Sequence, residues 1–98
     1  MSTLTLHHLV TVSTGAEFEL DWSYPELMIA FEMDGYGIHL RSLDAFEHDR
    51  LRRNELEIDG WRILNFTKRM VERQQHVVVS QARRMVEQQT MRGLPLVG

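Results

Sequence analysis

Three carboxylates, Asp21, Glu32 and Asp34, have a spacing that suits them to bind a divalent metal ion. Successive side chains of a strand point to opposite faces, so Glu32 and Asp34 project the same way. Asp21 lies near the end of the preceding strand pattern, and a turn at Pro25 would bring it beside Glu32. Mg²⁺ and Mn²⁺ prefer such oxygen ligands and can activate water against a phosphodiester. The spacing therefore points to hydrolytic metal chemistry.

Simpler interpretations of the same residues stay open. Gathered carboxylates repel each other unless a cation or protons neutralise them, but strands also commonly show single acidic side chains to solvent. Asp34-Gly35 is in addition a turn sequence.

The charge distribution agrees with a site of this kind. Residues 1–49 hold nine acidic residues and one basic residue, whereas residues 50–98 hold ten basic and five acidic ones. Carboxylates would serve a cation and the basic half would serve phosphate. The net charge of −3 argues against tight, non-specific DNA binding. The 98 residues predict one domain, and the absence of cysteine excludes disulfides and thiolate zinc sites.

The elements that must position these residues follow from periodicity and turn residues. Strands are predicted at residues 3–12, 17–24, 27–34 and 61–66. Ser13-Thr14-Gly15 predicts a hairpin turn between the first two. Helices are predicted at residues 43–59 and 77–91, with a brief helical turn at 67–71 and a loop at 73–76. Ser42 is the predicted N-cap of the first helix and Gly60 its stop.

The order strand, strand, strand, helix, strand, helix predicts an α/β fold with a four-stranded mixed sheet. A meander of three strands is followed by a helical crossover, which places the fourth strand parallel to the third. Trp61 is expected in the core rather than as a platform for a base. No apolar segment is long enough to span a bilayer and no signal peptide is evident, so a cytoplasmic location is expected.

Two sets of residues resemble the family catalogued as domain of unknown function 559, which is similar to very-short-patch-repair endonucleases within the PD-(D/E)xK superfamily. The first set is Asp21-Trp22-Ser23-Tyr24-Pro25-Glu26, Phe31-Glu32-Met33-Asp34-Gly35 and His39. The second is Phe46-Glu47-His48-Asp49-Arg50, Arg53-Asn54 and Gly60-Trp61-Arg62-Ile63-Leu64-Asn65-Phe66-Thr67. The resemblance spans more than half of the chain and implies a restriction-endonuclease-like core.

The resemblance also implies roles for individual residues. Asp21 and Glu32 occupy the metal-binding positions, and Mg²⁺ or Mn²⁺ is the implied cofactor. Asp34 stands where the superfamily usually has a lysine, so another group must stabilise the developing charge on phosphate. His39 is the candidate, as a general base or a phosphate contact. A solvent-facing loop histidine is the alternative interpretation of His39.

Basic residues of the first helix are candidate phosphate contacts. Arg50 and Arg53 are assigned to this role, and Arg53 is also four residues after Asp49, the spacing of an intrahelical ion pair. We favour a structural ion pair that holds the helix to the sheet over a catalytic role for Asp49 and Arg53. Arg50 is further grouped with other basic residues that could face phosphate, namely Arg52, Arg62, Lys68 and Arg69.

The resembled family usually has a helix before the first strand, with a further acidic residue, and this chain begins almost directly with the strand. Exposed apolar surface at that position predicts a homodimer. The leading hypothesis is a metal-dependent DNA endonuclease. The alternatives are an inactive nuclease-fold module that binds nucleic acid or a protein, and a protein-only interaction domain.

Overall fold

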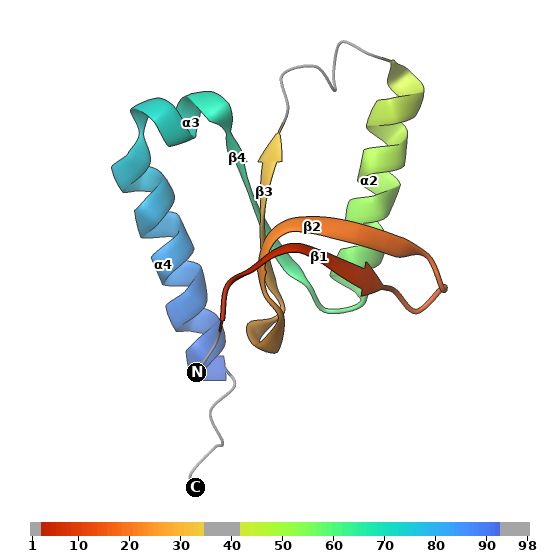
Figure 1. Ribbon diagram of the computed structural model, residues 1–98, viewed down its shortest axis with the longest axis horizontal. Coiled ribbons are helices and arrows are strands. Elements are labelled where there is room, and N and C mark those ends of the chain that lie inside the picture. The colour runs from red at the N-terminus through yellow and green to blue at the C-terminus, as the bar shows by residue number, and fades with distance from the viewer. Residues whose placement is uncertain (1–2, 35–41, 93–98) are drawn as a thin grey trace, which may run out of the picture.

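The computed structural model describes residues 3–34 and 42–92, which form a four-stranded sheet with flanking helices (Figure 1). The strands are β1 (Thr5–Thr11), β2 (Glu17–Tyr24), β3 (Ile29–Asp34) and β4 (Arg62–Thr67). The helices are the 3-10 turn η1 (Pro25–Leu27), α2 (Leu43–Ile58), α3 (Lys68–Arg73) and α4 (Gln75–Arg92). In Figure 1, α2 and α4 flank β3 and β4 from opposite sides. Within the described ranges, no helix combines the length and the apolar character needed to cross a membrane.

The sheet has the mixed topology that the order of elements predicts. Its strands are arranged β1-β2-β3-β4, with antiparallel pairing of β1 with β2 and of β2 with β3. The α2 crossover then returns the chain so that β4 pairs with β3 in parallel. The prediction of an α/β fold with a mixed four-stranded sheet is therefore confirmed for the described residues.

The pairing of β2 with β3 is short, and this shapes the region around the carboxylates. It covers three pairs, from Tyr24–Ile29 to Trp22–Phe31, whereas β2 pairs with β1 along most of its length. β3 continues beyond this point along β4, as far as the pair Asp34–Thr67. The β1–β2 hairpin consequently diverges from β3 and crosses it obliquely (Figure 1).

The predicted hairpin turn and the ends of α2 follow local backbone chemistry. Gly15 has a positive φ of 93°, a conformation that glycine adopts at little cost, and its N–H donates to the Val12 carbonyl. The Ser42 hydroxyl accepts from the Ala45 N–H at 3.0 Å and caps α2. Gly60, with φ of 99°, reverses the chain after α2 and donates to the Glu57 carbonyl. The prediction of a helix between Ser42 and Gly60 is confirmed.

One core cluster joins the hairpin, β3 and the C-terminal part of α2. Its buried members are Val12, Leu20, Ala30, Leu56 and Trp61. Trp61 is 5% exposed, so its predicted place in the core is confirmed. This cluster fixes the C-terminal end of α2 against the sheet, and thereby sets where the earlier turns of α2 lie.

Two details differ from the predictions. Leu27 belongs to η1 rather than to the third strand, because the turn that Pro25 begins delays the strand until Ile29. The predicted loop at 73–76 reduces to Gln74, whose carbonyl accepts from the Val77 and Val78 N–H groups and starts α4 at once. Along α2, Leu56 is buried whereas Leu51 is 65% exposed.

Candidate functional site

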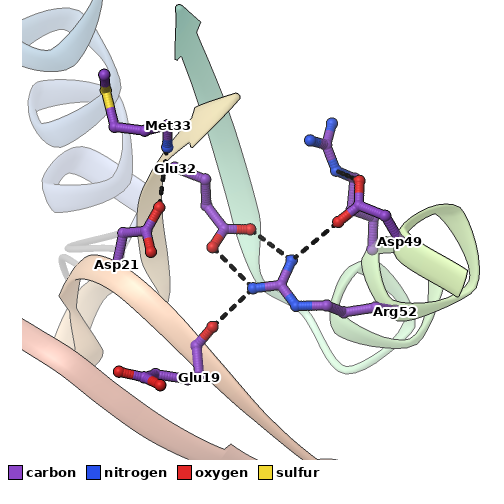
Figure 2. A network of polar contacts seen from close by, with 7 residues as sticks. Glu19, Asp21, Glu32, Met33, Asp49 and Arg52 are labelled. Carbon is purple, nitrogen blue, oxygen red and sulfur yellow. Dashed lines mark hydrogen bonds and ion pairs between the residues drawn. The ribbon is translucent and has the colours of Figure 1, made fainter. Parts of the chain in front are cut away.

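Asp21 lies at the point where β2 diverges from β3. There its side chain, rather than its backbone, forms the hydrogen bond to β3. One residue beyond the last β2–β3 pair, Asp21 Oδ2 accepts a hydrogen bond from the Met33 N–H at 2.9 Å. Met33 directly follows Glu32 in β3, so Asp21 is bonded to the neighbour of the second carboxylate (Figure 2). The expected proximity of Asp21 and Glu32 across the strand pair is present.

Glu32 is buried and is bound by a guanidinium from α2. Its side chain projects from β3 toward that helix, and the residue is only 6% exposed. Arg52 donates to both carboxylate oxygens, from Nη1 to Oε1 at 2.6 Å and from Nη2 to Oε2 at 2.7 Å. Such a bidentate pair is among the stronger polar contacts in proteins, and it neutralises a charge that burial would otherwise make costly.

Arg52 is the centre of a wider network that holds α2 to the sheet (Figure 2). Its Nη2 also donates to the Glu19 carbonyl at 2.7 Å, and its Nη1 lies 3.8 Å from Asp49 Oδ1. The hydrogen bond to Glu32 is the main reason that the pKa of Arg52 is raised. The charges of Glu32, Asp49 and Asp21 act in the same direction, and burial opposes them. Asp21 is therefore close enough for its charge to act on the guanidinium.

Asn65 adds an unsatisfied oxygen beside Glu32. In the parallel β3–β4 pair Asn65 stands opposite Glu32, and side chains of paired residues project from the same face of a sheet. Asn65 Oδ1 is buried and has no hydrogen-bond partner among the residues that the structure describes. A buried polar atom without a partner is costly and calls for a physical explanation, of which a bound water or ion is one. The donors at this place, two carboxylates and an amide oxygen, are those that Mg²⁺ and Mn²⁺ prefer, so the residues fit the implied metal.

Two of the candidate catalytic residues are not placed by the structure. The backbone of Asp34 ends β3 and pairs with Thr67, but its side chain is not described. His39 lies outside the described residues. Their expected roles stay predictions.

The two predicted phosphate contacts on α2 have different surroundings. Arg53 Nε lies 3.0 Å from Asp49 Oδ2, so the expected intrahelical pair is formed, and both side chains are largely buried. Arg50 is exposed, with its guanidinium carbon 4.7 Å from the centre of the Phe46 ring. Of the two, Arg50 is the one available to a ligand from solvent.

The role of Arg52 was not predicted from the sequence. Arg52 was grouped with basic residues that could face phosphate, whereas its side chain is 15% exposed and points inward to Glu32. The available signal is the position of Arg52 one helical turn from both Asp49 and Leu56, on the face of α2 that contacts the sheet. Asn65 was likewise overlooked as a polar residue of a strand rich in bulky side chains.

Comparison with protein-family models, with curated proteins and with solved structures gave no significant match for the chain. Within residues 3–34 and 42–92, no three histidine or acidic side chains gather as a metal site. The candidate site therefore consists of Asp21, Glu32 and Asn65, with Arg52 bound to one of the two carboxylates.

Proposed function

We propose that this protein is a metal-dependent endonuclease that hydrolyses phosphodiester bonds of DNA on a restriction-endonuclease-like core. The observation that supports it most is that Asp21, buried Glu32 and Asn65 lie in a row across β2, β3 and β4, with Asn65 Oδ1 left without a partner among the described residues. The resemblance of the surrounding motifs to very-short-patch-repair-type nucleases supports the same assignment.

In this proposal Asp21 and Glu32 hold Mg²⁺ or Mn²⁺, and Asn65 offers a third oxygen. When bound, the ion would polarise the scissile phosphodiester and lower the pKa of a water that attacks it. Asp21 Oδ2 keeps its bond to the Met33 N–H, which fixes the orientation of the carboxylate. Such fixed orientation matters because misplaced ligands weaken both metal affinity and rate.

Arg52 has two tasks in this proposal. Without a metal ion it neutralises Glu32, as the two hydrogen bonds between them show. With the ion in place, its guanidinium supplies a positive charge to the site. In the superfamily this charge normally comes from a lysine, and Asp34 stands at the lysine position in this chain. Exposed Arg50 of α2 would then contact the DNA backbone nearby.

The test is nicking of supercoiled plasmid in Mg²⁺ or Mn²⁺. Asp21→Asn keeps an oxygen that can accept from the Met33 N–H and removes the charge, so cleavage should fall by at least about 100-fold. Glu19→Gln is the matched control, because Glu19 lies on the same strand with its carboxylate exposed and paired with His7. Asp21→Asn protein that nicks DNA at the wild-type rate would contradict the assignment.

A second candidate function is a nucleic-acid-binding or protein-binding module without catalysis. The observation in its favour is that Arg52 occupies both oxygens of Glu32, so that the site is electrically satisfied without a metal ion. Calorimetric titration of Mn²⁺ separates the two functions. Heat that is present in wild type and lost in Glu32→Gln supports the nuclease, and the absence of heat in wild type supports the module.

A further inference from the structure

An apolar groove lies between α4 and the face of the sheet opposite α2. Its volume is about 480 Å³, and aromatic side chains of three strands line its floor: Trp22, Tyr24, Phe31 and Phe66. Residues of α4 form one wall, including Val79, Arg83 and Glu87. Open apolar surface of this kind is common at protein–protein contacts.

The wall that α4 forms continues along this helix as a stripe of four residues at intervals of four: Val79, Arg83, Glu87 and Met91. All four are exposed, with 51% of Val79 and 68% of Met91 accessible to solvent. Residues at this spacing form a continuous ridge on a helix. The ridge reads apolar, positive, negative, apolar.

This order is complementary to itself when the ridge is reversed. If a second α4 lies antiparallel to the first, Val79 meets Met91 and Arg83 meets Glu87, and the two-fold axis repeats both contacts. Each contact therefore joins two apolar side chains or two opposite charges. Ridges of this kind interdigitate in the commonest class of helix packing.

The two charges of the ridge also lack ion-pair partners among the described residues of one copy. In the described part of the chain neither Arg83 nor Glu87 forms an ion pair, although they are four residues apart on one helix. The order Arg before Glu is the weaker orientation for an intrahelical pair, because it opposes the helix dipole. A reversed second ridge would give both charges a partner.

We propose that the protein forms a two-fold symmetric dimer in which α4 packs antiparallel on α4 of a second copy. The axis passes between Arg83 and Glu87, and the apolar groove beside the ridge lies against the partner. A second copy is the favoured occupant because the complementarity lies within one ridge. The proposal does not depend on nuclease activity.

The test is a charge exchange followed by sedimentation velocity at concentrations from about 1 to 100 µM. Wild type is expected to show a concentration-dependent dimer. Arg83→Glu gives two contacts between like negative charges, and Glu87→Arg gives two between like positive charges. Each variant should raise the dissociation constant by at least about tenfold. Arg69→Glu, an exposed reversal on α3, is the matched control and should leave the constant unchanged.

The decisive sample is an equimolar mixture of the two reversed variants, Arg83→Glu and Glu87→Arg. Opposite charges then face each other at both contacts, so the mixture should dimerise when neither variant does so alone. The double variant Arg83→Glu/Glu87→Arg should also dimerise, since its ridge remains complementary to itself. Monomeric wild type at 100 µM would overturn the proposal. A dimer that neither single reversal weakens would overturn it too, because another surface would then mediate association.

Discussion

Replacing Arg52 with methionine tests whether Arg52 neutralises the charge of buried Glu32. Methionine keeps much of the apolar length of the side chain but leaves Glu32, which is 6% exposed, without its counter-charge. Breaking one side of a buried ion pair typically costs about 3–5 kcal/mol. The Arg52 side chain is still 15% exposed and water can reach it, so we expect the lower end, about 3 kcal/mol.

The assay is urea unfolding at pH 7.5, first without metal and then with Mn²⁺. Arg69→Met is the matched control, because Arg69 is exposed on α3 and its replacement should change the unfolding free energy by less than about 0.5 kcal/mol. Arg52→Met removes the guanidinium whose positive charge acts on both Asp21 and Glu32. Mn²⁺ should therefore stabilise this variant more than wild type. At a hundred times the dissociation constant of the variant, the ion should raise the variant's free energy of unfolding by about 2.7 kcal/mol.

A third variant makes the outcome specific to Glu32. In Arg52→Met/Glu32→Gln the buried carboxylate is also gone, so Mn²⁺ should give little stabilisation. Equal stabilisation of wild type, the single variant and the double variant would refute the reasoning, because the ion would then bind elsewhere. No stabilisation of any of them would refute it as well.

Three further predictions concern the fold around the site. Leu56→Ala should lower the free energy of unfolding by about 2–5 kcal/mol because Leu56 is fully buried, whereas Leu51→Ala, at a residue 65% exposed, should lower it by less than about 0.5 kcal/mol. Equal losses for the two variants in urea unfolding would contradict the packing of α2. Gly60→Ala should cost about 1 kcal/mol or more because φ is 99° there, and an unchanged midpoint in thermal unfolding would argue against this turn. The bond to Glu32 raises the pKa of Arg52, so the stability that Arg52 contributes is complete below its usual alkaline pKa and is lost only above it. The stability difference between wild type and Arg52→Met should hence be constant from pH 7 to 10, and a steady decline with rising pH would contradict it.

Much of the fold could be predicted because its signals are local. Ser42 and Gly60 bracket α2 through backbone capping and a positive φ, and both act within a few residues. The hairpin turn at Gly15 has the same origin. The direction of each strand then follows from the connection before it. A short turn joins antiparallel neighbours, whereas a helical crossover joins parallel ones.

The candidate site was only partly predictable, because its decisive contacts join distant elements. Asp21 and Glu32 were placed together by the strand pattern, but the bond from Met33 depends on where β2 diverges from β3. Three arginines occur between residues 50 and 53, and periodicity alone does not decide which one reaches the sheet. The core contacts of Leu56 set the rotation of α2, and Arg52, one turn away, is thereby directed to Glu32.

The exposed residues at the start of the hairpin show the same limit. Hydrophobic alternation along residues 3–12 would place Leu4 and Leu6 on one face with Val12, yet Leu4 is 46% and Leu6 58% exposed, whereas Val12 is 3% exposed. His7 lies between the two regions with a positive φ of 50°, which changes the course of β1. A backbone change of this kind at a non-glycine residue has no signal in hydrophobic alternation.

The most direct test of the central claim is a crystal structure of the protein grown with Mn²⁺, using the anomalous scattering of the ion. We predict one strong peak within coordinating distance, about 2.0–2.3 Å, of carboxylate oxygens of both Asp21 and Glu32, with Arg52 displaced from at least one Glu32 oxygen. A crystal soaked at millimolar Mn²⁺ that shows no peak there, with Arg52 still bound to both oxygens of Glu32, would contradict the claim.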